Sequence, residues 1–173
     1  MKTKIMKTLF VALLGTGLAS TAYAESSQVK FSGKILAESC TVVTPDKTKT
    51  VVLGNYNKSV FTAVGTTSTK VPFSITLEDC DTQPVRMRYQ GTAVSGSPEI
   101  LALTGGAGFA QGVGVVVYEQ GGANPITVGD YTARKNATSG TNLTFNFEAA
   151  YKRHGTLVAG KADASADLII DYN

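Results

Sequence analysis

The chain has 173 residues, of which 43% are hydrophobic and 17% charged, with 16 basic and 13 acidic side chains. This length suits one domain with a sizeable core. No apolar run is long enough to span a bilayer, and no cluster of basic residues points to nucleic acid. The sequence therefore disfavours a membrane anchor and does not indicate nucleic-acid binding.

The first 24 residues predict a secretory signal peptide. They combine three early lysines, a short apolar run over residues 9–14 and the cleavage motif Ala22-Tyr23-Ala24. Three basic residues and no acidic ones lie in this segment, so the exported part carries 13 basic and 13 acidic side chains. A surface without net charge removes one barrier to self-association. We expect residues 25–173 to form the mature protein.

Residues 29–35, VKFSGKI, have the alternation of a β-strand. Val29, Phe31, Gly33 and Ile35 share one face, while Lys30, Ser32 and Lys34 share the other. The apolar face therefore has a gap at Gly33. This pattern does not indicate whether the strand joins a sheet of its own chain or one of another molecule.

The only two cysteines, Cys40 and Cys80, both lie in the exported part. In an oxidising compartment the expected state is one disulfide, and the chain-entropy estimate for a loop of about 41 residues is roughly 4 kcal/mol. A metal pair or two free thiols are the alternatives. No histidine or further cysteine stands at ligand spacing nearby, so the sequence favours the disulfide.

Short alternating runs separated by Gly, Asn, Asp, Ser and Pro predict an all-β sandwich. The expected strands after the opening one are residues 50–54, 71–80, 85–91, 99–104, 112–120, 125–128 and 143–153, followed by a tail over 159–173.

The tail is amphipathic almost to its last residue. Its apolar face consists of Ala162, Ala164, Ala166, Leu168, Ile170 and Tyr172. The opposite face is polar, with Ile169 as the exception. A sandwich normally places one more strand beside such a segment, and no later residues supply it, so we expect the missing strand to come from elsewhere.

The sequence contains no strong catalytic motif. The glycine cluster of residues 105–114 lacks the lysine and serine or threonine of a phosphate-binding loop, and we interpret it as a loop into a buried strand. His154, the only histidine, is predicted to lie in a turn beside Gly155. We find no carboxylate pair, no catalytic triad and no metal or cofactor site, so we expect no enzyme.

Several segments of the mature chain together resemble the pilins of the chaperone–usher pathway, in particular the major subunits of type 1 fimbriae. These segments are V-x-F-x-G-x-I ahead of Cys40, TVVLG (50–54), FSITLEDCDT (73–82), GTAV (91–94), LAL (101–103), GVGVVVYE (112–119), FEAAY (147–151) and the end with Tyr172 next to the last residue.

The resemblance implies an incomplete immunoglobulin-like β-sandwich that lacks its final strand and is completed by a donor strand from a neighbouring subunit. The implied organisation is a signal peptide (1–24), an amino-terminal donor-strand extension (25–37) and a pilin domain (38–173). Val29, Phe31, Gly33 and Ile35 would be the donor face. The edge of the acceptor groove and the contact with the chaperone would comprise Ala162, Ala164, Ala166, Leu168, Ile170, Tyr172 and Asn173.

The resemblance also implies partners and a location. Identical subunits would form a homopolymer, with a periplasmic chaperone, an outer-membrane usher and adaptor or adhesin pilins at the tip. The fibre would be a fimbrium on the surface of a Gram-negative bacterium, where it supports cell adhesion. A minor or adaptor pilin, a small carbohydrate-binding adhesin module and a self-complemented monomer are the alternatives.

Overall fold

The computed structural model describes residues 27–33 and 40–172. The chain separates into two compact units, Met1–Lys34 and Ile35–Asn173. In the first unit the described residues have no regular secondary structure, and the side chains of Val29 and Phe31 are 67% and 93% exposed. The predicted signal peptide and Ile35 lie outside the described residues.

The second unit is almost entirely β-structure, with two single 3-10 turns in its described part. Within residues 40–172 the strands are β1 (Thr41–Val42), β2 (Val71–Glu78), β3 (Pro84–Gln90), β4 (Ala93–Val94), β5 (Ser97–Leu101), β6 (Gln111–Glu119), β7 (Lys135–Asn136), β8 (Leu143–Val158) and β9 (Asp167–Asp171). The 3-10 turns are η1 (Thr44–Asp46) and η2 (Lys58–Val60).

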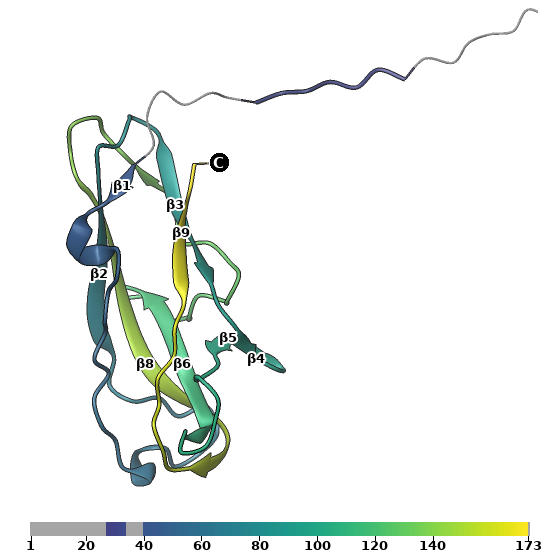
Figure 1. Cartoon of the computed structure of the whole chain (residues 1–173), viewed down its shortest axis with the longest axis vertical. Helices are drawn as coiled ribbons and strands as arrows, with labels where there is room; N and C mark the ends of the chain where they lie inside the picture. The colour runs from purple at the N-terminus through teal and green to yellow at the C-terminus, as the bar shows by residue number, and fades with distance from the viewer. Residues whose placement is uncertain (1–26, 34–39, 173) are drawn as a thin grey trace, which may run out of the picture. The chain divides into compact units, whose positions relative to one another are not determined.

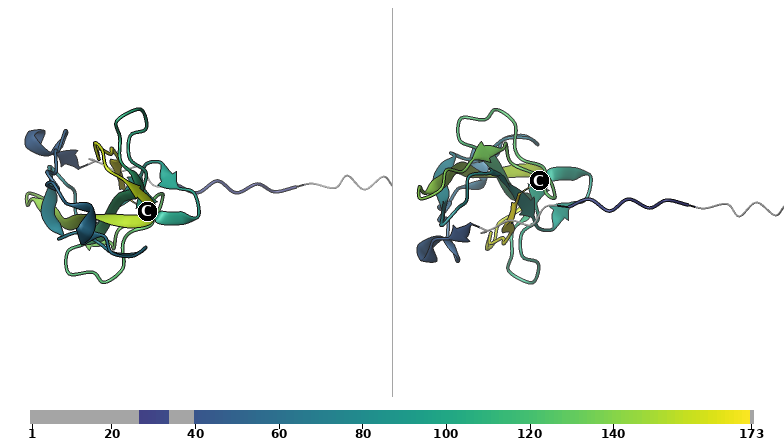
Figure 2. Two further views of the ribbon diagram at one scale, coloured as in Figure 1. Left: turned by 90° about the horizontal axis from the view of Figure 1, so that it is seen from below. Right: turned by 90° about the horizontal axis from the view of Figure 1, so that it is seen from above.

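The strands form two antiparallel sheets. One has six strands in the order β1-β2-β8-β6-β5-β4, and the other has three in the order β7-β3-β9. Figure 1 shows β9 running alongside β3, with β2, β8 and β6 forming the other sheet, and the end-on views of Figure 2 place the tail and β8 in different layers. The architecture is the immunoglobulin-like β-sandwich that the resemblance implies.

The core lies between these layers because alternate residues of each strand point inward. Its fully buried side chains include Leu77, Val85, Met87, Phe145 and Phe147. A smaller apolar cluster on the other face of the six-stranded sheet contains Ile100, Val116, Tyr118 and Ala150. Since β6 contributes to both clusters, its valines are buried on both faces, which explains the continuous apolar run in its sequence.

Most of the predicted strands are confirmed, and β8 is longer than expected. β8 extends to Val158, so His154 lies inside a strand and the prediction of a turn there is wrong. Gly155 does not interrupt the strand, because β8 is paired with β6 as far as Val158 opposite Gln111, with an irregularity in the register.

Two predicted strands are wrong because alternation alone does not supply a pairing partner. In residues 125–128 the N–H of Ile126 bonds to Val117 while the N–H of Val128 bonds to Pro98, so two different strands receive the bonds and no continuous ladder forms. Residues 50–54 alternate as expected, with Val52 77% exposed, yet they belong to no strand. Likewise, only Asp167–Asp171 of the tail forms a regular strand.

The expected disulfide is confirmed. Cys40 and Cys80 are bonded, which joins the beginning of β1 to the end of β2. Both residues are buried in the core. Among the described residues, no helix is long and apolar enough to cross a membrane.

Candidate functional site: an open groove beside the tail

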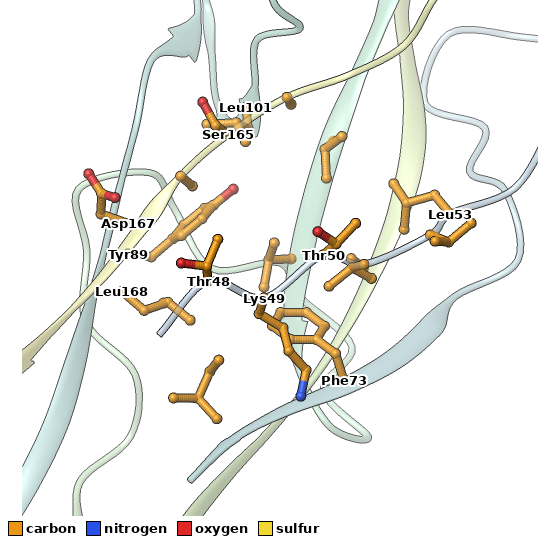
Figure 3. Close-up of a pocket in the computed structure, with 18 of the residues that line it drawn as sticks. Thr48, Lys49, Thr50, Leu53, Phe73, Tyr89, Leu101, Ser165, Asp167 and Leu168 are labelled. Atoms are coloured by element: carbon orange, nitrogen blue, oxygen red, sulfur yellow. The ribbon is translucent and has the colours of Figure 1, made fainter. Parts of the chain in front are cut away.

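A long groove of about 1190 Å³ runs between the two sheets of the second unit. One wall is the tail from Ala162 to Ile170, and the other is residues 46–55, which we call the leading segment. Figure 1 shows both segments running lengthwise over β2, β8 and β6, and Figure 3 shows the residues that line the space between them. Residues 50–54 of the leading segment and residues 162–166 of the tail have a strand pattern but no ladder, whereas the tail continues into the paired strand β9.

The floor of the groove is apolar and well packed. It consists of Phe73, Ile75, Tyr89, Leu101, Val115, Val117, Ala149 and Tyr151. The rings of Phe73 and Phe147 stack with their centroids 5.2 Å apart, which fixes the floor at the β2–β8 pair. The floor therefore offers an elongated hydrophobic surface that an extended apolar segment could cover.

The backbone of β9 has one paired edge and one edge that faces the groove. The N–H and C=O groups of Met87 and Tyr89 on β3 bond to Asp130, Gly129 and Thr132, away from β9. In an antiparallel sheet the N–H and C=O groups of successive residues point to opposite edges of a strand. The backbone groups of Arg86 and Arg88 therefore bond to β9, where these residues lie opposite Asp171 and Ile169. The same alternation directs the N–H and C=O groups of Leu168 and Ile170 toward the groove.

Side-chain contacts hold β9 against β3 at its paired edge. The Nε of Arg86 donates to Asp171 at 2.8 Å, and its guanidinium lies 3.8 Å from the ring centroid of Tyr131. Nearer the start of the tail, the hydroxyl of Tyr151 donates to the C=O of Ala162 at 2.8 Å. Burial raises the pKa of the Tyr151 phenol, so this donor stays protonated at neutral pH. The open wall of the groove is thus anchored at both ends.

A buried carboxylate helps to hold the leading segment in place. Asp46, with a side chain only 7% exposed, accepts hydrogen bonds from the Nζ of Lys49 at 2.6 Å and from the N–H of Thr76 at 2.8 Å. These donors, Lys49 first, hold the pKa of Asp46 below the usual 3.8 of an aspartate. The carboxylate therefore satisfies an outward-facing amide of β2 and fixes the second wall.

Tyr89 contributes a buried polar group to the floor. Its side chain is 2% exposed, and its hydroxyl has no hydrogen-bond partner among the described residues. Burial raises the pKa of this phenol above its ordinary value, so the group remains a neutral donor. Figure 3 shows the ring lying beside the tail between Leu168 and Ser165.

The structure brings most of the predicted acceptor residues together. Ala162, Ala164, Ala166, Leu168 and Ile170 all line the groove. Tyr172 packs against the core, with its hydroxyl 3.4 Å from the C=O of Cys40, and it is not among the lining residues. Asn173 lies outside the described residues, and the predicted donor residues Val29, Phe31 and Gly33 belong to the other unit.

Sequence reasoning missed the second wall and the polar groups. The alternation of Val51 and Leu53 was a usable signal, because both side chains pack inward against the core. Asp46 and Tyr89 carried no such signal, since their roles depend on which amide and which cavity the fold places beside them.

Comparison with known proteins agrees with this geometry. The family model described as "Fimbrial protein" matches residues 29–173. The chain belongs to the fimbrial protein family. A type-1 fimbrial protein subunit of Serratia marcescens is 34% identical over 171 residues, covering 93% of this chain and 94% of the relative. The type-1 fimbrial protein A chain of Salmonella typhi is 30% identical, covering 99% of this chain and 100% of the relative.

The fold of this pilin is also similar to that of a solved pilus subunit. The P pilus rod subunit PapA has a TM-score of 0.66 and 20% identity, with 78% of this chain and 99% of the other covered. The pilin is therefore a structural fimbrial subunit with the sandwich fold of pilus proteins, and its family is one of structural proteins rather than enzymes.

Proposed function

We propose that this pilin polymerises by donor-strand exchange, in which residues 29–35 of one copy fill the groove of another. The observation that carries the proposal is the groove itself. An apolar floor lies open between the tail and the leading segment, and the backbone of Leu168 and Ile170 is directed into it. Exposed apolar surface and unpaired backbone groups are both costly in water, so the groove favours an added strand.

The donor face is complementary to this groove. Val29 and Phe31 are exposed in their own unit, so they are available for burial elsewhere. Burying Val29, Phe31 and Ile35 contributes roughly 5–9 kcal/mol at about 1.5–3 kcal/mol for each side chain. Gly33 would sit where the groove is too shallow for a side chain. A ladder of main-chain hydrogen bonds would add to this stabilisation.

Such a contact is head-to-tail. The donor residues and the groove are different surfaces of the chain. When one copy inserts its donor strand into the groove of a second copy, the first still has an open groove and the second still has a free donor strand. Heterologous contacts of this kind build open filaments. The proposed product is therefore a homopolymeric fibre on the cell surface, supporting adhesion, with adaptor or adhesin pilins at its tip.

The proposed pathway to the fibre begins with a signal peptide (1–24), followed by the donor extension (25–37) and the pilin domain (38–173). A periplasmic chaperone would cover the groove, contacting the tail including Tyr172 and Asn173, until an outer-membrane usher exchanges it for the next subunit. Support comes from a structural neighbour, a chaperone–usher pilus subunit with a TM-score of 0.66 and 20% identity, of which 100% is covered by 90% of this chain. The role is structural, without catalysis.

Three chains test the proposal: the mature protein, a truncation lacking residues 25–36, and that truncation with VKFSGKI fused after Asn173 through a flexible turn. The fusion should be a monomer that melts at least about 10 °C above the truncation, since each kcal/mol shifts Tm by about 2–4 °C at this size. Only the mature chain should polymerise, as measured by light scattering.

A matched control carries Phe31→Ser within the fused strand, which keeps its length and removes its largest apolar side chain. This control should lose most of the gain in Tm. If the mature chain stays monomeric at high concentration without chaperone and has the same Tm as the fusion, it is self-complemented. That result would contradict the proposal.

A further inference from the structure

The outer face of the tail and the outer face of the donor strand carry opposite charges at the same spacing. Asp163 and Asp167 are four residues apart and exposed on the tail, where Asp163 also contacts the Nζ of Lys161 at 2.7 Å in an exposed ion pair. Lys30 and Lys34 are also four residues apart, on the donor face opposite Val29 and its apolar neighbours. Because side chains alternate between the two faces of a strand, residues four apart point to the same face, with one other residue of that face between them.

We infer that Lys30 of one copy pairs with Asp167 of the next copy, and Lys34 with Asp163, and that these ion pairs select the register of the docked strand. The inference rests on the proposed function and adds a determinant of specificity to the same groove. The occupant is a second copy of this chain.

The two apolar faces restrict the possible registers. Odd-numbered donor residues and even-numbered tail residues must both point into the groove, so alternative registers differ by steps of two. All strand pairs of the two described sheets are antiparallel, and antiparallel pairing is the more stable arrangement. We therefore consider antiparallel docking against the free edge of β9.

One antiparallel register satisfies both faces. When Gly33 lies opposite Ala164, the donor face lies opposite residues that all line the groove, namely Ala162, Ala164, Ala166 and Leu168. On the outer face the same register places Lys30 opposite Asp167 and Lys34 opposite Asp163. Opposite charges directly across a strand pair are stabilising, and like charges are destabilising.

The neighbouring registers lose this match. A slip of two residues in one direction places Lys34 opposite Lys161 and Lys30 opposite Ser165, which replaces an attraction by a repulsion. A slip of two in the other direction places Lys30 opposite the exposed side chain of Ile169. Each wrong register therefore removes both ion pairs, which is how a charge pattern discriminates between otherwise similar apolar contacts.

A slip of four residues toward the end of the tail would again oppose both lysines to aspartates, but less favourably, and a slip of four the other way would place Lys34 opposite Ala159. Lys30 would meet Asp171, which the Nε of Arg86 contacts at 2.8 Å in a largely buried pair, whereas the contact between Lys161 and Asp163 is solvent-exposed and easily replaced. Val29 would lie opposite Tyr172, beyond the residues that line the groove. The matched register is thus the one in which apolar burial and charge agree.

The backbone direction of the tail favours a close approach of the charged pair. Leu168 directs its N–H and C=O into the groove, so Val29 and Leu168 would form a hydrogen-bonded pair and Lys30 and Asp167 a non-hydrogen-bonded one. In such pairs the Cα atoms are about 4.5 Å apart and the side chains are closer together. Figure 3 shows the Asp167 carboxylate on the opposite side of the tail from Leu168, at the rim of the groove.

Charge reversal in the full mature chain tests the inference. Lys30→Glu and Asp167→Lys should each slow assembly at low ionic strength by about threefold to tenfold, because each replaces an attraction by a repulsion at a solvent-exposed site. An equimolar mixture of the two variants should recover the original rate, since every joint between unlike chains again has opposite charges. In about 1 M salt, where the Debye length is about 3 Å, the differences should disappear.

Two controls separate register from general charge effects. Arg134→Glu makes the same charge change at an exposed position outside the groove and should leave the assembly rate unchanged. Trapping reports register directly: a Lys30→Cys chain mixed with an Asp167→Cys chain should form an intermolecular disulfide, and with a Ser165→Cys chain it should not.

The outcomes distinguish this inference from the proposed function. Equal assembly rates for all charge variants at low salt, or trapping through Ser165→Cys in preference to Asp167→Cys, would overturn the register while leaving strand exchange intact. A mature chain that forms no intermolecular contact at all would overturn both.

Discussion

The two strand edges that border the groove, those of β2 and β9, differ in whether their backbone groups are paired. The edge of β2 is closed: β1 pairs with its end, the N–H of Val43 bonds to the C=O of Thr76, and Asp46 accepts the N–H of Thr76. Pro72 has no N–H to offer at the same edge. The edge of β9 instead directs the backbone of Leu168 and Ile170 into the groove.

This difference shows how one sandwich can be open to assembly and still resist unspecific aggregation. Exposed strand edges are templates for pairing with any extended chain, and proteins block them with proline, charge or short covering strands. Here the blocking devices stand on β2, while the available edge lies inside a groove whose floor selects an apolar face. Docking is thereby limited to one edge and to segments with the right alternation.

The largest expected effect comes from a change at the closed edge of β2. Replacing Cys40 and Cys80 by alanine removes the bond between β1 and β2, and the loss should be roughly 4 kcal/mol of unfolding free energy by the loop-entropy estimate. Denaturant unfolding of the monomer measures it. The reduced wild-type chain should behave like the double variant, and an unchanged midpoint would show that the edge is held by noncovalent contacts alone.

A second effect concerns the open edge and should appear in assembly alone. Gly33→Leu adds a side chain where the donor strand passes over the groove, and overpacking costs about 1–3 kcal/mol, which slows or weakens assembly by about fivefold or more. The unfolding midpoint of the isolated subunit should not change, because Gly33 lies outside the unit Ile35–Asn173. Fibre formation equal to that of wild type would contradict the shallow-pocket assignment.

The smallest effect returns to the closed edge. Asp46→Asn weakens the contacts with Lys49 and Thr76 and should cost about 1 kcal/mol at neutral pH. Since the pKa of Asp46 is lowered in the folded state, its contribution is complete above the ordinary value of 3.8 and is lost as the pH falls through the folded value. Unfolding curves of wild type and variant should therefore converge in acid.

The matched control for this prediction is Asp130→Asn, at an exposed position where the carboxylate accepts the N–H of the neighbouring Tyr131. It should shift the midpoint much less than Asp46→Asn at neutral pH. A constant difference between Asp46→Asn and wild type from neutral pH into acid would show that the carboxylate charge is not what holds the leading segment.

Alternation in the sequence was enough to predict the inward faces of most strands. The burial of Ile75 and Leu77 on β2 and of Phe145 and Phe147 on β8 follows the alternation of their sequences, since side-chain direction depends only on the local period of the chain. The disulfide followed from having two cysteines in an exported chain. The apolar face of the tail from Ala162 to Ile170 was also predictable, and all of it borders the groove.

What alternation could not decide was whether each face had a neighbour. Residues 50–54 and 162–166 have strand patterns but no ladder, whereas the short strand Lys135–Asn136 has a ladder with little pattern. Pairing is a property of two segments distant in the sequence, and only their arrangement in space determines it. For the same reason the tertiary structure alone placed Asp46 against Thr76, buried the Tyr89 hydroxyl and left one edge of β9 facing an open groove.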